Sequence, residues 1–209
     1  NALCMQCHNK PFVDGKQGQT ISNFYDSPKH HFHKQGSTGA QCIECHMAGK
    51  HYMGIDFRRD HSFRIPRPDL SVKHGTPNAC NTCHKDKDAK WAEAAVVKNY
   101  GDKRKPHFSD LLLAGRDQKN PNPPKLIELA MDTTQPPIAR ATALWILQNF
   151  PYRESLLCAR ELLQDKEPIV RYHAMAVFNQ FDQTQRKIIF SPLLLDKVRA
   201  VRMQAASNI

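Results

Sequence analysis

The chain has 209 residues, of which 40% are hydrophobic and 24% are charged, and its 30 Lys and Arg against 20 Asp and Glu give a formal net charge of +10. Its apolar runs are only a few residues long, far below the ~20 residues of a membrane-spanning helix, so we expect no membrane span and a soluble chain of one or two domains. The basic residues are dispersed without a nucleic-acid-binding motif, which argues against a nucleic-acid partner.

Six of the seven cysteines fall into three copies of the pentapeptide C-x-x-C-H, at residues 4–8, 42–46 and 80–84. This pattern is the attachment signature of c-type haem. Two thiols three residues apart on a helical turn can each add to a vinyl group of one haem, and the His that follows becomes the proximal iron ligand. We predict three covalent haem c groups attached through Cys4, Cys7, Cys42, Cys45, Cys80 and Cys83, with His8, His46 and His84 as proximal ligands.

Two other uses of paired cysteines fit the pattern less well. Zinc sites built from four cysteines need an even number of C-x-x-C pairs, whereas the chain has three, and zinc gives no reason for a His after each pair. A disulfide scaffold leaves the same histidines unexplained.

The histidines outside the motifs are candidates for the second axial ligand of each iron. Their surplus favours bis-His ligation, which is typical of low-potential carriers, while a methionine ligand (Met5, Met47 or Met53) would raise the potential and is less expected, because Met usually fills a core. Our candidate distal ligands are His30, His33 and His61, whereas His51, His74, His107 and His173 have weaker claims.

Local sequence supports these three candidates. Pro28 suits a helix start, and a helix would place His30 and His33 on one face. There they can serve two neighbouring haems, or one can ligate an iron while the other hydrogen-bonds a haem propionate. Asp60 precedes His61 and is a candidate to orient its ring.

Three segments resemble the C-terminal haem-binding part of multihaem c-type cytochromes related to the cytochrome c554 family. They are His-His-Phe-His at 30–33, Arg-Arg-Asp-His-Ser-Phe-Arg-Ile-Pro-Arg-Pro-Asp-Leu-Ser at 58–71 and Gly-Thr-Pro-Asn-Ala-Cys-Asn-Thr-Cys-His at 75–84. The resemblance covers roughly residues 1–101 and favours His30 and His61 as distal ligands.

The resemblance also has implications for the whole protein. It implies a periplasmic or extracellular electron-transfer protein with mostly bis-His haems, and a leader is expected because covalent haem attachment takes place outside the cytoplasmic membrane. Relatives usually carry further C-x-x-C-H motifs upstream, so we expect this chain to be part of a longer protein in which ligands are exchanged with other haem-bearing segments.

The second half of the chain has another composition. Residues 88–101 are expected to form a helix with an acidic start and a Gly stop, and residues 105–122 are polar and rich in proline, which predicts a linker. Arg140, Arg171 and Arg202 then follow one another at a 31-residue step within a Pro-x-x-Arg-x-x-Ala pattern. Two helices per unit of about 30 residues resemble HEAT-type repeats, in which Arg and Asp form a structural ladder.

We therefore expect an all-α fold in which a haem-packed cytochrome c module with little regular structure beyond short helices (1–104) and a Pro-rich linker (105–122) precede a HEAT-like α-solenoid (123–209). The expected function is electron transfer through three haems, with the repeats docking redox partner proteins or further haem-bearing subunits. The alternatives are a multihaem oxidoreductase of a small nitrogen or sulfur oxyanion, and a structural subunit of an extracellular cytochrome filament, which would make the protein a homo-oligomer.

Overall fold

The computed structural model describes residues 1–8, 12–13, 20–21, 25–116 and 122–209. The chain forms two compact units, Asn1–Lys103 and Arg104–Ile209. Within the described residues, no helix is long and apolar enough to cross a membrane.

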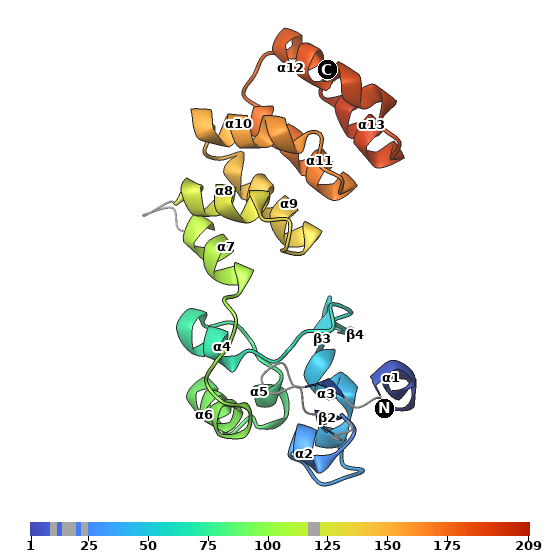
Figure 1. Ribbon diagram of the computed structural model, residues 1–209, viewed down its shortest axis with the longest axis vertical. Helices are drawn as coiled ribbons and strands as arrows, with labels where there is room; N and C mark the ends of the chain where they lie inside the picture. Colours follow the sequence, from blue (N-terminus) through green and yellow to red (C-terminus); the bar gives the residue numbers. More distant parts are fainter. Residues whose placement is uncertain (9–11, 14–19, 22–24, 117–121) are drawn as a thin grey trace. The chain divides into compact units, whose positions relative to one another are not determined.

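Short helices and two small hairpins make up the first unit (Figure 1). Its helices are α1 (Ala2–His8), α2 (Pro28–His31), the 3-10 turn η1 (Thr38–Ala40), α3 (Cys42–His46), α4 (Pro68–His74), α5 (Cys80–Cys83) and α6 (Ala89–Tyr100). Its strands pair antiparallel, β1 (Phe12–Val13) with β2 (Thr20–Ile21) and β3 (Gly49–Tyr52) with β4 (Asp56–Arg59).

Two short strand pairs add to the helices of the first unit, in a chain that is mostly helical as expected. In the second hairpin the register runs from Gly49 opposite Arg59 to Tyr52 opposite Asp56. Its tip is a tight turn in which Met53 and Gly54 have φ angles of 51° and 82°. Two successive positive φ angles define the turn type that matches the twist of paired strands, and Gly adopts them without steric cost.

Helix α6 confirms the expectation for residues 88–101. The side chain of Asp88 accepts a hydrogen bond from the Trp91 amide, 2.8 Å away, at the start of the helix. Gly101, with φ of 85°, follows its last residue. The acidic start and the Gly stop are thus the two ends of this helix.

Buried apolar side chains are distributed very unevenly between the two units. In the described part of the first unit, the buried hydrophobic residues are Ala40, Leu70 and Ala92, two of which carry only a methyl group. The second unit has a continuous core. Many large apolar side chains of the first unit are instead exposed: Leu3, Phe32, Tyr52, Met53, Ile55, Phe57, Phe63, Ile65, Val72, Trp91, Val97 and Tyr100. The described residues of the first unit therefore form little protein core of their own around its three C-x-x-C-H motifs.

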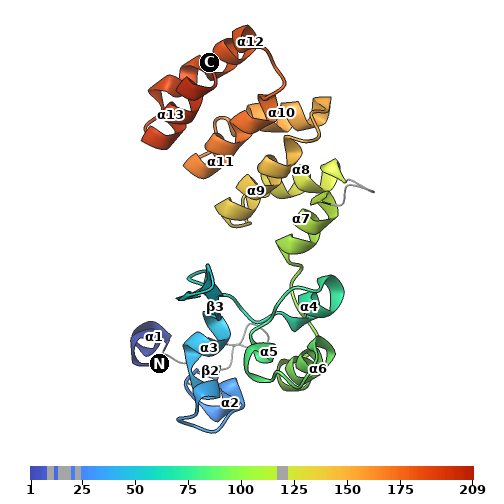
Figure 2. The same ribbon diagram turned by 180° about the vertical axis from the view of Figure 1, so that it is seen from behind.

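Helical hairpins build the second unit. Its helices are α7 (Phe108–Arg116), α8 (Pro123–Met131), α9 (Pro137–Leu147), α10 (Arg153–Leu162), α11 (Pro168–Ala174) with η2 (Met175–Phe178), α12 (Gln183–Phe190) with η3 (Ser191–Leu195), and α13 (Arg199–Ser207). Helices α9, α11 and α13 follow one another along one side of the stack, as both views show (Figures 1 and 2). This arrangement is the expected solenoid of two-helix repeats.

Part of the stretch expected as a linker is helical. Helix α7 lies within residues 105–122, and its Leu111 and Leu112 side chains pack against the core of the second unit. Because of these contacts, α7 packs as part of the second unit and does not form an unstructured linker. Residues 117–121 of the expected linker lie outside the described residues.

Ion pairs between successive repeats confirm the expected Arg–Asp ladder. The Arg140 guanidinium binds both carboxylate oxygens of Asp165, at 2.5 and 3.3 Å, and Arg171 binds both oxygens of Asp196, at 2.7 and 2.8 Å. The Arg140 side chain is only 1% exposed and also donates to the Ala130 carbonyl. Each bidentate pair fixes one repeat against the next.

Candidate functional site

Each C-x-x-C-H motif lies on its own short helix. The first lies within α1, the second is α3 itself, and the third is α5 with His84 directly after it. One helical turn has 3.6 residues, so the two cysteines of each motif lie on one face of their helix. All six thiols are free of disulfide bonds. Each motif thus presents two thiols together, as attachment of one group requires.

The cysteines of neighbouring motifs also lie close to one another. Burial, and then the nearby Cys4 thiol, raise the pKa of Cys42. Burial, followed by the Cys80 and Cys83 thiols, raises the pKa of Cys45. In both views, α3 with the second motif lies between α1 and α5, which carry the first and the third (Figures 1 and 2).

Two of the proximal-ligand candidates each have a second imidazole nearby. The ring centroids of His46 and His30 are 6.2 Å apart with an interplanar angle of 4°, and those of His84 and His33 are 6.1 Å apart with an angle of 37°. Two imidazoles that each bound one metal ion at about 2 Å would have their centroids about 6 Å apart, which is close to the separation in both pairs. The rings of His30 and His46 are stacked, and those of His33 and His84 are tilted.

The segment that carries His30 and His33 does not have the expected form. Helix α2 begins at Pro28, as predicted, but it ends at His31 because Phe32 adopts a left-handed conformation with φ of 55°. His33 lies beyond this break, so the prediction that His30 and His33 share a helix face is wrong. The break instead directs the two imidazoles toward different motifs.

Hydrogen bonds determine which ring nitrogen remains for a metal. The Nδ1 atom of His46 donates to the Arg64 carbonyl, 2.8 Å away, and Nδ1 of His33 donates to the His31 carbonyl. A carbonyl oxygen can only accept, so in both rings Nδ1 carries the proton and Nε2 keeps its lone pair. Histidines that bind metals usually donate their other ring N–H to a carbonyl or carboxylate in this way, which fixes the tautomer.

His31 differs in this respect. Its Nδ1 atom accepts a hydrogen bond from the His33 amide, at 3.2 Å, so Nε2 carries the proton and donates to the Gln35 side chain, at 3.1 Å. Both nitrogens are engaged. His31 therefore offers no lone pair to an iron and makes a matched control for its two neighbours.

His61 has a free Nε2 atom, but its ring is oriented by a different group from the one expected. Its Nδ1 atom donates to the Arg59 carbonyl, 2.8 Å away. The Asp60 carboxylate, predicted to orient this ring, instead accepts hydrogen bonds from the Ser62 amide and the Arg64 guanidinium. These hydrogen bonds, from Ser62 first and then Arg64, lower the pKa of Asp60 to about 2.

The remaining histidines have other neighbours. The His8 ring lies edge-on to Tyr25 at 5.7 Å, and the His51 ring lies near Phe57 at 5.3 Å. The Nδ1 atom of His107 is 2.7 Å from the Ser109 hydroxyl. In the solenoid, His173 packs on Tyr172 and burial lowers its pKa. Among the alternative ligands, Met53 is 83% exposed at the hairpin tip.

Tyr100 joins the end of α6 to the segment that carries His30. Its hydroxyl donates to the His30 carbonyl, and its ring lies edge-on to Phe32 at 5.2 Å. Although Tyr100 is 56% exposed overall, desolvation of its hydroxyl, and then the Cys45 and Cys80 thiols, raise its pKa. Tyr100 therefore lies where the second and third motifs meet, a role that its place near the end of a predicted helix did not indicate.

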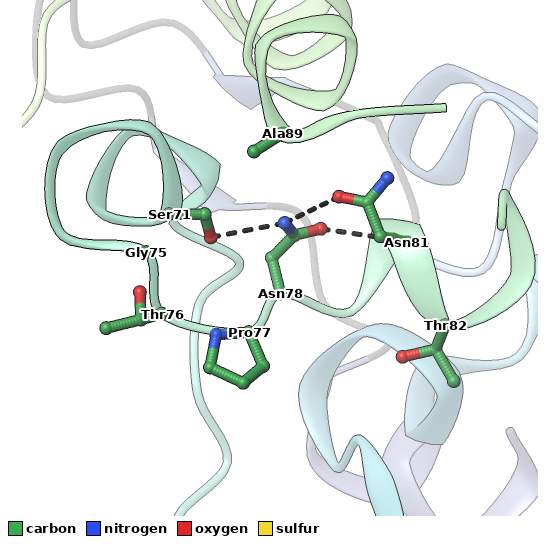
Figure 3. A pocket seen from close by; sticks show the side chains of 8 residues that line it. All are labelled: Ser71, Gly75, Thr76, Pro77, Asn78, Asn81, Thr82 and Ala89. Atoms are coloured by element: carbon green, nitrogen blue, oxygen red, sulfur yellow. Dashed lines mark hydrogen bonds between the residues drawn. The ribbon is translucent and has the colours of Figure 1, made fainter. Parts of the chain in front are cut away.

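A network of asparagines holds the third motif. Asn78 donates to the Ser71 hydroxyl on α4 at 3.1 Å and to the Asn81 side chain at 2.7 Å, and its own side-chain oxygen accepts from the Asn81 amide (Figure 3). Asn81 in turn donates to the Lys87 carbonyl at 2.8 Å. These side chains line an open hollow of about 340 Å³. In the sequence, the only feature that singled out Asn78 and Asn81 was their position in the segment Gly-Thr-Pro-Asn-Ala-Cys-Asn.

The arginines after the second motif are all paired with carboxylates. Arg59 binds Glu44 at 2.6 Å and also donates to the carbonyls of Ile43 on α3 and of Met47 directly after it. The other three pairs are Arg58 with Asp56, Arg64 with Asp60, and Arg67 with Asp69. Arg59 thus ties β4 to the helix of the second motif.

Within the part of the chain that the structure describes, no group of three or more His, Cys, Asp or Glu side chains is gathered to hold a metal ion. A haem iron needs only two protein ligands, because the porphyrin supplies the other four.

Comparison with known proteins bears on the second unit. Residues 123–209 match the family of HEAT repeats. No curated protein matches the chain, and neither does any solved structure. The stacked helix pairs and this match agree that residues 123–209 form HEAT-type helical repeats.

Proposed function

We propose that this protein is a multihaem c-type cytochrome that relays electrons through three covalently attached haems. The observation that carries the proposal is the pair of imidazole contacts, His30 with His46 and His33 with His84, at 6.2 and 6.1 Å. In each pair, one ring belongs to a C-x-x-C-H motif and the other comes from a separate segment. That arrangement is the one expected of bis-His ligation, which favours electron transfer over substrate binding at iron.

The protein residues have distinct tasks in this proposal. The six motif cysteines attach the groups, and the hydrogen bond from His46 to the Arg64 carbonyl leaves Nε2 as the donor to iron. Haem, when attached, supplies the one-electron redox chemistry. Because His30 and His33 come from one short segment, their two irons would be neighbours, which suits transfer between them.

The sparse core of the first unit supports the same proposal. Ala40, Leu70 and Ala92 bury little apolar surface for a unit of about one hundred residues, and small domains with poor cores usually depend on an added structural element. Three porphyrins would supply that apolar interior. They would lie among exposed residues such as Trp91, whose ring centroid is 4.7 Å from that of His84.

HEAT repeats form extended surfaces that commonly bind other proteins. We assign the second unit the role of docking a redox partner or a further haem-bearing subunit. Because haem c is attached outside the cytoplasmic membrane, the protein would act in the periplasm or outside the cell.

Three variants of the haem-loaded chain test the proposal. We expect His30→Ala and His33→Ala each to convert one low-spin haem to a high-spin or ligand-exchanged form in EPR and optical spectra. His31→Ala should leave the spectra unchanged, since both nitrogens of that ring are engaged. Unchanged spectra in both the His30 and His33 variants would refute the ligand assignment and the bis-His relay built on it.

A further inference from the structure

The turn from Asp60 to Arg64 follows β4 and is held by one carboxylate. One oxygen of Asp60 accepts a hydrogen bond from the Ser62 amide at 2.8 Å, and the other accepts from the Arg64 guanidinium at 2.7 Å. Phe63 lies between Ser62 and Arg64 and has a positive φ of 49°, which costs free energy in a residue other than glycine. The contacts on either side of Phe63 hold the turn in this conformation.

This turn contacts two imidazoles through backbone carbonyls. The Arg64 carbonyl accepts from Nδ1 of His46, and the Arg64 amide donates to the His46 carbonyl at 2.9 Å. At the other end, the Arg59 carbonyl accepts from Nδ1 of His61 at 2.8 Å. One short segment therefore sets the orientation and tautomer of a proximal ligand and of a candidate distal ligand.

The start of the turn is anchored independently of the Asp60 carboxylate. The Arg59 side chain holds Glu44 and the Ile43 and Met47 carbonyls, and the Asp60 amide donates to the Ala48 carbonyl at 3.2 Å. Loss of the Asp60 carboxylate would leave this anchor in place. Removing the Asp60 carboxylate should therefore displace the far end of the turn, at the Arg64 carbonyl.

We propose that Asp60 is a positioning residue that holds the Arg64 carbonyl against His46 and thereby tunes the iron bound by His46. The inference rests on the proposed function. A hydrogen bond from Nδ1–H to a carbonyl makes Nε2 a stronger donor, which stabilises ferric over ferrous iron. Weakening that hydrogen bond should raise the reduction potential of this one haem.

The test compares variants of the haem-loaded full chain by redox titration and EPR. In Asp60→Ala, we expect three haems to be retained and the ferrous-to-ferric ratio of one haem at fixed potential to rise about tenfold, which corresponds to about 59 mV. Asp60→Asn should give a smaller rise, because its amide oxygen can still accept from the Ser62 amide but no longer forms the ion pair with Arg64. Asp56→Ala is the matched control, since it removes the exposed ion pair with Arg58 in the same hairpin; it should shift nothing.

The outcomes separate the two proposals. A wild-type chain without covalent haem would refute the proposed function itself. A haem-loaded Asp60→Ala chain whose potentials and EPR signals match those of Asp56→Ala would refute the positioning role alone. If Asp60→Ala yields no folded protein, Asp60→Asn decides: a raised potential at one haem supports the role, and unchanged potentials overturn it.

Discussion

Replacing Arg140 with Ala should destabilise the HEAT-repeat unit strongly. The Arg140 and Asp165 side chains are 1% and 7% exposed, so water cannot replace their mutual contacts. The substitution leaves the Asp165 carboxylate buried without its cation and the Ala130 carbonyl without its donor. Breaking a buried ion pair from one side costs about 3–5 kcal/mol.

In Arg140→Ala, Asp165 still accepts a hydrogen bond from the Glu167 amide at 2.8 Å. We therefore expect the loss of unfolding free energy to stay within that range of about 3–5 kcal/mol. For a unit of this size, each kcal/mol corresponds to about 4–8 °C in Tm, so the midpoint should fall by more than about 10 °C. Lys125→Ala removes an exposed pair with Glu128 and should cost less than about 0.5 kcal/mol. The double variant Arg140→Met, Asp165→Leu should recover most of the loss, because apolar replacement of both partners leaves no buried charge.

Urea unfolding followed by tryptophan fluorescence measures this effect. The chain has two tryptophans, Trp91 and Trp145, so a Trp91→Phe background makes Trp145 on α9 report the second unit. A loss below about 1 kcal/mol for Arg140→Ala, or one equal to that of Lys125→Ala, would refute the reasoning that this pair is buried and carries inter-repeat stability.

Three further outcomes are expected. A Cβ at Gly39 would lie 2.4 Å from the His33 ring, so Gly39→Ala should displace that imidazole and alter the spectrum of one haem, whereas unaltered EPR would contradict the close packing. The hydrogen bond from Arg171 lowers the pKa of Asp196. The ionised Asp196 carboxylate therefore contributes to stability above about pH 4, and this contribution is lost as pH falls through the depressed pKa. Urea midpoints measured between pH 6 and 2 should fall less in Arg171→Met than in the parent chain. Burial raises the pKa of Cys158 to about 12, so this thiol should resist iodoacetamide at pH 8 in the folded chain, and rapid alkylation without unfolding would show that it is accessible.

Periodic patterns in the sequence predicted the second unit well. The 31-residue step of Arg140, Arg171 and Arg202 reflects two helices per repeat, and the ladder contacts of the first two arginines follow directly from it. The helical state of α7 was missed because Pro-rich flanks at both ends obscured a short apolar turn. Its Leu111 and Leu112 gain their burial only from packing on the repeats, which no local pattern expresses.

The first unit was predictable in its motifs but not in its geometry. The C-x-x-C-H spacing predicts the attachment residues, since that spacing is a property of one helical turn. Which imidazole faces which motif depends on the left-handed Phe32 that ends α2, a single backbone angle that a Pro28-initiated helix pattern does not reveal. The carbonyl partners of His46 and His61 could not be predicted either, because every residue has a backbone carbonyl whatever its side chain.

Intact mass spectrometry of the native chain, after unfolding and alkylation with iodoacetamide, tests the central claim most directly. The chain has seven cysteines, and six of them belong to the three motifs. If those six hold haem through thioether bonds, the mass will rise by three haems and by one alkyl group, on Cys158. A chain that gains no haem and takes up seven alkyl groups would contradict the account.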